Sequence, residues 1–138
     1  IFTVTLKNDK LTVEINTKGA ELNSIKVNGE NRLWSGDPEY WTGKAPVLFD
    51  MGGLPDDKFT YNGAEYILNK HGFAKLKEFT VEHKNDLTAT FLLKSDDETL
   101  KSYPWSFELR ITYALRGAAV KVTYDVKNTS ADAMYMSI

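Results

Sequence analysis

The sequence predicts an all-β protein built as an antiparallel β-sandwich. Over most of the 138-residue chain, apolar residues recur at every second position, which is the side-chain period of a half-buried strand. Asn-Gly pairs at positions 28–29 and 62–63 are typical of the tight turns that join antiparallel strands. Helical patterns extend over single turns only. Short strands that follow one another through turns favour a sandwich over an α/β fold.

The first thirty residues are expected to form a meander of antiparallel strands. Apolar and polar residues alternate over residues 2–6 and again over residues 11–15, with Asn8-Asp9 as the turn between them. After Gly19 the alternation resumes out of phase over residues 22–27, which predicts a β-bulge. The first Asn-Gly pair then supplies a hairpin turn.

The alternation fails between residues 32 and 57, where a long ordered loop is expected. Asp37 is placed to cap a short helical turn over residues 38–41. Glycines at positions 52 and 53 permit unusual backbone angles and a close approach of the backbone to a ligand. Three aromatic side chains are interpreted as packing the loop from within: Trp34, Tyr40 and Trp41.

Strand patterns fill the second half of the chain. Strands are expected over residues 59–61, 66–68, 79–83, 87–93, 105–115 and 120–126 and, after a turn at 128–130, in a final strand. The acidic residues Asp96, Asp97 and Glu98 are expected to cap a helical turn over residues 99–102. A cation site is the alternative, but their spacing matches no calcium-loop pattern. Because residues 134–138 still alternate, we expect the chain to be cut inside a sheet.

Composition narrows the function classes. The formal net charge is −2 and the pI is about 5.7, so no basic field exists to attract nucleic acid or an anionic membrane. No apolar run approaches the length of a membrane span. The absence of cysteine excludes disulfides, thiolate nucleophiles and thiolate metal sites. A cytoplasmic location is the expectation.

Residues 69–75, Asn-Lys-His-Gly-Phe-Ala-Lys, form the first candidate for chemistry. They contain His71, one of only two histidines, and histidine is the side chain that titrates near neutrality. A histidine in a polar loop can act as an acid, a base or a hydroxyl ligand. The alternative is a structural loop histidine bonded to backbone. His83 follows the phase of a predicted strand and is expected to have a structural or surface role.

Three segments form a distinctive set in chain order. They read Leu-Trp-Ser-Gly-Asp-Pro-Glu-Tyr-Trp at 33–41, Ala-Pro-Val-Leu-Phe at 45–49 and His-Gly-Phe-Ala-Lys at 71–75, with Phe79 four positions later. The set resembles the aldose 1-epimerase (galactose mutarotase) family, most closely its bacterial LacX-like branch. Glu-Thr-Leu-Lys-x-Tyr-Pro-Trp-x-Phe at 98–107 and Tyr-x-Ser-Ile at 135–138 extend the likeness over essentially the whole chain.

The resemblance implies a galactose mutarotase-like supersandwich of about twice this length, with residues 1–138 as the N-terminal part of a single domain. It implies an isomerase that interconverts the α and β anomers of a free hexose by acid/base ring opening, without cofactor or metal. The family's principal histidine and its catalytic glutamate lie outside this chain, so this portion alone is expected to be inactive. A hexose-phosphate 1-epimerase and a non-catalytic carbohydrate-binding β-sandwich are the alternatives.

The expected partner is therefore a small-molecule sugar, with no nucleic acid and no membrane, and homodimer formation is left open. The resemblance gives His71 a substrate-contacting, supporting role. Family members carry one arginine shortly after the segment that corresponds to residues 45–49 and another at the position of Lys75. This chain has no arginine shortly after residue 49 and has lysine in place of the other. Lysine does not replace the planar fork of arginine, which allows an altered sugar preference or a weakened activity. The residues expected to bind sugar are His71, Gly72, Phe73, Lys75 and Asp50.

Two of these assignments have open alternatives. Asp50 is read either as a polar sugar contact or as a turn or solvated carboxylate. The aromatic loop is read as loop core, with a platform on which a sugar stacks as its alternative.

Overall fold

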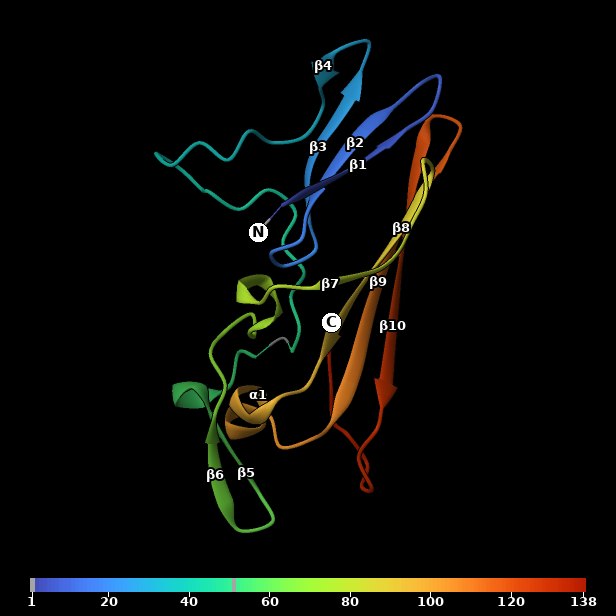
Figure 1. The fold of residues 1–138 in the computed structure, drawn as a ribbon. Coiled ribbons are helices and arrows are strands. Elements are labelled where there is room, and N and C mark those ends of the chain that lie inside the picture. Colours follow the sequence, from blue (N-terminus) through green and yellow to red (C-terminus); the bar gives the residue numbers. More distant parts are fainter. Residues whose placement is uncertain (1, 51) are drawn as a thin grey trace.

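The computed structural model describes residues 2–50 and 52–138, in which two four-stranded antiparallel sheets pack against each other (Figure 1). The first sheet has the order β1-β2-β3-β4 and comprises β1 (Thr3–Lys7), β2 (Thr12–Asn16), β3 (Glu21–Val27) and β4 (Glu30–Asn31). The second has the order β10-β9-β8-β7 and comprises β7 (Thr80–Lys84), β8 (Thr88–Lys94), β9 (Phe107–Arg116) and β10 (Ala119–Asn128). The predicted all-β antiparallel class is confirmed.

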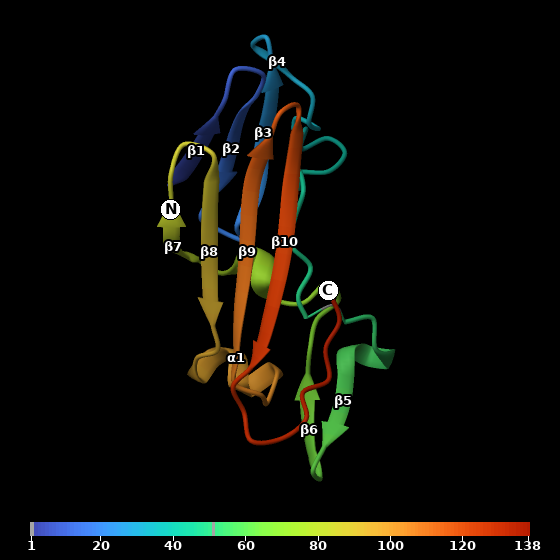
Figure 2. The same cartoon turned by 90° about the vertical axis from the view of Figure 1, so that its right-hand side faces the viewer.

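A separate hairpin lies beside one end of the second sheet. It consists of β5 (Lys58–Tyr61) and β6 (Ala64–Ile67), joined by the predicted Asn62-Gly63 turn. Figure 2 shows this hairpin next to the chain that leaves β10. Two 3-10 turns, Pro55–Asp57 and Ala74–Leu76, flank the hairpin in the sequence.

The predicted bulge lies between β2 and β3. Glu14 pairs with Ser24, whereas the next residue, Ile15, pairs with Leu22, so Asn23 is the extra residue. Leu22 is buried before the phase change, and Ile25 and Val27 beyond it are partly buried against the core.

One hydrophobic cluster fills the space between the sheets. In β9 every second side chain is buried, as the long period-two pattern predicted. The Tyr113 hydroxyl of β9 donates a hydrogen bond of 2.6 Å to the carbonyl of Ala20, immediately before β3, and so ties the two sheets together. Burial raises the pKa of the Tyr113 phenol above its usual range, which keeps it protonated as this donor.

Replacing the fully buried Ile111 of β9 with alanine is expected to lower the free energy of unfolding by about 3 kcal/mol. The change removes buried methyl groups and leaves a cavity that the packed sheets cannot close. Chemical denaturation monitored by circular dichroism measures the loss. The exposed Lys121 of β10 provides the control: Lys121→Ala is expected to change the value by no more than about 0.5 kcal/mol. Equal effects of the two changes would contradict this core assignment.

Helix α1 (Asp97–Ser102) connects β8 to β9 and carries the predicted N-terminal cap. The Asp96 carboxylate accepts a hydrogen bond of 2.7 Å from the Thr99 amide, and the Thr99 hydroxyl oxygen accepts one of 2.9 Å from the Asp96 amide. This reciprocal pair is a capping box, and Asp97 and Glu98 lie in the first turn, where negative charge is favourable. The acidic cluster is therefore the cap that the sequence predicted.

The loop of residues 32–57 contains the predicted turn, but its aromatic residues differ from expectation. The Asp37 carbonyl accepts hydrogen bonds from the amides of Tyr40 (3.1 Å) and Trp41 (3.0 Å). The interpretation of these rings as loop core is wrong, because Trp34, Tyr40 and Trp41 are 44%, 73% and 55% exposed. Figure 1 shows the reason: the loop after β4 leads away from both sheets. The Trp34 ring meets that of Tyr40 edge-on at 6.5 Å, and its Nε1 donates to the Trp41 carbonyl at 2.7 Å.

The prediction of a final strand is also wrong. The expected turn forms, with the side-chain oxygen of Asn128 accepting from the Ser130 amide at 2.9 Å. Residues 133–138, however, join no strand ladder within the described chain. Their alternation matches a strand, but strand formation needs a paired neighbour, and side chains of other segments bind this one instead.

Candidate functional site

Two predicted site segments meet at a short backbone contact. Phe49 and Gly72 form an isolated parallel bridge, and the Phe49 carbonyl accepts hydrogen bonds from the amides of Phe73 (3.0 Å) and Ala74 (2.9 Å). Asp50 therefore lies against the loop that carries His71, although the sequence separates the two by about twenty residues.

Gly72 makes this contact possible. It has φ +70°, a region that side chains disfavour, and a Cβ atom built on it would lie 2.1 Å from the Asp50 carbonyl oxygen. His71 before it also has a positive φ, of 71°. Only a residue without a side chain fits at position 72, so the approach of residues 49–50 requires glycine there.

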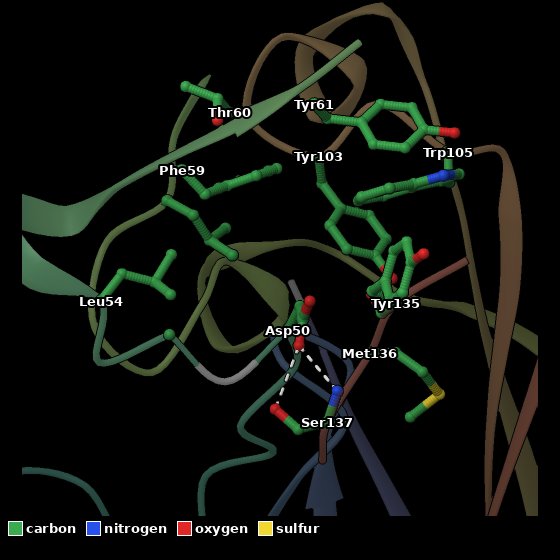
Figure 3. Close-up of a pocket in the computed structure, with 12 residues that line it drawn as sticks. Asp50, Leu54, Phe59, Thr60, Tyr61, Tyr103, Trp105, Tyr135, Met136 and Ser137 are labelled. Atoms are coloured by element: carbon green, nitrogen blue, oxygen red, sulfur yellow. Dashed lines mark hydrogen bonds between the residues drawn. The ribbon is translucent and has the colours of Figure 1, made fainter. Parts of the chain in front are cut away.

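A cavity of about 500 Å³ opens beside Asp50, and Figure 3 shows its walls. We call it the Asp50 cavity. Its size falls in the range of small-molecule sites. Its lining comes from the loop before β5, the β5–β6 hairpin, the connection between α1 and β9, and residues 135–137. The lining residues are Asp50, Gly52, Leu54, Phe59, Thr60, Tyr61, Leu68, Tyr103, Trp105, Tyr135, Met136 and Ser137.

Hydrogen bonds hold the last residues against this cavity. A carboxylate oxygen of the buried Asp50 accepts from the amide of Ser137 at 2.9 Å and from its hydroxyl at 3.3 Å (Figure 3). The Tyr103 hydroxyl donates to the carbonyl of Tyr135 at 2.6 Å. Burial, and then the negative charge of Asp50, raises the pKa of the Tyr103 phenol above its usual range, so it remains a donor at neutral pH.

Trp105 is the centre of the aromatic side of the cavity. Its ring centroid lies 4.7 Å from that of Tyr61, 4.9 Å from that of Tyr103 and 5.9 Å from that of Tyr135. The ring of Phe59 is nearly parallel to it at 6.2 Å. Such clusters supply apolar faces on which the C–H groups of a ligand can pack.

His71 lies beside the Asp50 cavity without lining it. Its side chain is half-buried, and its Nδ1 atom is buried with no hydrogen-bond partner among the residues that the structure describes. The alternative interpretation of His71, a structural histidine bonded to backbone, would require such a bond, and among the described residues none is formed to Nδ1. Its role toward a sugar stays a prediction.

The other predicted sugar-binding residues divide between two places. The Phe73 ring packs against Phe49 at 6.0 Å and Phe107 at 6.0 Å, within the aromatic core. Lys75 lines a second cavity, of about 360 Å³, together with Lys18. The structure therefore brings Asp50, Gly72 and Phe73 together and places Lys75 apart from the Asp50 cavity. Sugar contacts by all of them stay predictions, and His83 is exposed on β7 as expected.

Sequence reasoning missed most of the residues that form the cavity. Tyr103 and Trp105 lie in the segment at 98–107 and Tyr135 and Ser137 in that at 135–138, both recognised for their likeness to the family but given no role. The Tyr-Pro-Trp sequence reads as the start of a strand, and the last residues read as strand. Only the Tyr103–Tyr135 and Asp50–Ser137 contacts, over long sequence separations, show that they share a site.

Comparison with known proteins gives consistent matches. A family model described as aldose 1-epimerase matches residues 3–138. The chain is 39% identical over 137 residues to protein LacX, plasmid, of Lactococcus lactis subsp. lactis, covering 94% of this chain and 46% of that protein. It thus spans about half the length of the curated relatives it matches.

Solved structures agree. The galactose mutarotase related enzyme from Lactobacillus acidophilus is 39% identical with a TM-score of 0.94, covering 96% of this chain and 45% of that one. A galactose mutarotase-like protein from Lactobacillus casei is 32% identical with a TM-score of 0.92, covering 96% and 46%. Among the described residues, no helix has the length and apolar character that a membrane crossing requires.

Proposed function

Because the chain belongs to the aldose 1-epimerase family, we propose that the protein interconverts the α and β anomers of a free aldose. The observation that carries the proposal is the Asp50 cavity beside the His71 loop. It combines aromatic faces with a buried carboxylate, the kind of surface on which a sugar can place its C–H face and its hydroxyls.

The reaction requires one base and one acid. A carboxylate takes the proton of the anomeric hydroxyl while an acid protonates the ring oxygen, the ring opens, the aldehyde rotates, and closure forms the other anomer. We propose that neither the base nor the principal acid is among residues 1–138, as the resemblance implies. His71 is assigned the supporting role, contact with the ring oxygen and neighbouring hydroxyls, and the half-buried position of its ring supports this assignment.

The lining of the cavity favours a free aldose over a hexose phosphate. No lysine, arginine or histidine is among the described residues that line it, so it offers a phosphate no cationic partner. The two lysines nearest to His71 in the sequence are also absent from the lining of this cavity: Lys70 is exposed, and Lys75 lines the second cavity.

Polarimetry of freshly dissolved α-glucose and α-galactose tests the proposal. The full-length protein, with the principal histidine and the glutamate that the resemblance implies, is expected to accelerate the approach to anomeric equilibrium well beyond the rate in buffer, because paired acid and base groups typically contribute about 10²–10⁴-fold. Residues 1–138 alone are expected to be inactive. Heat-inactivated protein serves as the control, and α-glucose 6-phosphate is expected to react more slowly. Mutarotation at the rate of buffer alone, with sugar binding retained, would replace the enzyme by the carbohydrate-binding alternative.

A further inference from the structure

Two turns that contact each other form one side of the second cavity. The turn between β2 and β3 lies beside the Ala74–Leu76 turn (Figure 1), and the Gly19 amide donates to the Lys77 carbonyl at 2.7 Å. A Cβ atom built on Gly19 would lie 2.8 Å from the Lys75 carbonyl oxygen. Lys18 precedes this glycine, so the two lysines of the lining stand on segments that are fixed to each other.

Residues 41–46 form another side of the cavity. A carboxylate oxygen of Glu21 on β3 accepts hydrogen bonds from the two backbone amides that follow Gly43, at 2.7 Å and 3.1 Å. The indole of Trp41 packs on Gly43 itself, where an added Cβ atom would lie 2.7 Å from Nε1. This contact fixes the position of the ring, although 55% of Trp41 is exposed.

The cavity has a cationic lining. It contains two lysines and one glutamate, which leaves one net positive charge. Neither Lys18 nor Lys75 forms an ion pair within the described chain, and Glu21 is engaged with backbone amides instead. Five other basic residues of the described chain do form ion pairs with carboxylates: Lys26, Arg32, Lys58, Lys77 and Arg110. Two ammonium groups are therefore available to a ligand at one place.

Ring surface and uncharged polar groups complete this lining. The exposed part of Trp41 offers an apolar face on which the C–H groups of a sugar can pack. The side-chain amide of Asn16 and the hydroxyl of Thr42 can exchange hydrogen bonds with sugar hydroxyls. The volume of about 360 Å³ falls in the range of small-molecule sites.

We propose that the second cavity binds an anionic monosaccharide, a sugar that carries a phosphate or carboxylate group. The ammonium groups pair with the anionic oxygens, while the indole takes the sugar ring. A neutral sugar gains the ring contact alone, and an inorganic anion gains the charge contacts alone. This cavity shares no lining residue with the Asp50 cavity, so the proposal goes beyond the proposed function and does not depend on it.

Nuclear magnetic resonance of the full-length protein tests the proposal by binding. The indole N–H signal of Trp41, assigned as the signal that Trp41→Phe removes, reports occupancy of this cavity. Glucose 6-phosphate, glucuronate, glucose and inorganic phosphate are titrated at low ionic strength. An anionic sugar is expected to bind about tenfold more tightly than glucose, because two exposed charge contacts each add a few-fold, and more tightly than phosphate.

Each outcome of this series bears on the proposal. Tight binding of only one anionic sugar supports it and identifies phosphate or carboxylate as the group that is recognised. Equal affinities for glucose and both anionic sugars would overturn it, as would equal affinities for phosphate and glucose 6-phosphate. A Trp41 signal that no sugar shifts would overturn it as well.

Charge removal provides the second arm. Lys18→Gln and Lys75→Gln are each expected to reduce the preference for the anionic sugar over glucose about threefold. Lys121→Gln removes the same charge from the exposed surface of β10 and is expected to leave the preference intact. Because Lys18 is exposed, its replacement leaves the packing of the turns in place. An undiminished preference in Lys18→Gln contradicts the proposal.

The contribution of the ring is tested separately. Trp41→Ala is expected to weaken binding of glucose 6-phosphate about fivefold and binding of inorganic phosphate little. Tyr40→Ala removes the neighbouring ring, which is 73% exposed and does not line the cavity, and is expected to change neither affinity. The backbone amide signal of Gly43 reports binding in both variants. Equal effects of the two changes would show that the sugar ring is not recognised here.

Discussion

Replacing Gly72 with alanine is expected to lower the free energy of unfolding by more than about 3 kcal/mol, an unusually large loss for a single added methyl group. The methyl carbon would lie 2.1 Å from the Asp50 carbonyl oxygen and 2.5 Å from its amide nitrogen. Both are backbone atoms of a segment bonded through Phe49 to the amides of Phe73 and Ala74, so neither can move without breaking the contact. The positive φ of Gly72 adds a further cost for any L-residue.

Gly63 provides the matched control for this change. It has a similar φ of +78°, but an added Cβ there meets nothing within 4 Å. Gly63→Ala is expected to cost about 1 kcal/mol, the conformational cost alone. Urea denaturation of both variants separates the two contributions. Similar losses at the two positions would show that the contact between residues 49–50 and the His71 loop is less tight than the structure indicates.

In the full-length protein, replacing His71 with asparagine is expected to lower the rate of mutarotation about 100-fold or more, with little change in stability. Asparagine tolerates the positive φ of this position better than most residues, so the loop can keep its conformation. What the change removes is a titratable ring placed beside the Asp50 cavity, and acid or base groups in such positions typically contribute about 10²–10⁴-fold.

The second histidine of the chain, His83, provides the matched control for this change. His83→Asn alters an exposed residue of β7 and is expected to leave the rate unchanged. Polarimetry gives the rate and thermal denaturation shows whether the fold is retained. If a folded His71→Asn variant kept the full rate, His71 would have to be removed from the site.

The features that the sequence predicted well are those that neighbouring residues determine. The buried face of β9 follows from its alternation, the hairpin of β5 and β6 from Asn62-Gly63, and the cap of α1 from Asp96 and Thr99. In each, the side-chain period or a local hydrogen bond decides the conformation within a few residues. Such signals are readable in a single sequence.

The predictions that failed concern features that depend on contacts with segments distant in the sequence. Residues 133–138 have the alternation of a strand but bond to Tyr103 and Asp50, and Trp34 has the character of a core residue but lies on a loop that leads away from the sheets. The same holds for the site. Family likeness pointed to His71, but only the folded chain shows that Asp50 meets Gly72 and that Trp105 and Tyr135 share one cavity.

The attachment of residues 133–138 has a consequence for motion. Proteins open in cooperative units, and the free energy of opening of each unit follows the interactions that must break. In the described chain this segment is held by side chains, Tyr103 on one carbonyl and Asp50 on one amide, while β9 is bonded along its whole length to β8 and β10. Opening of this segment therefore involves the loss of side-chain contacts and not of a strand ladder. Because Tyr135, Met136 and Ser137 form one wall of the Asp50 cavity, such an opening would change the shape of that cavity.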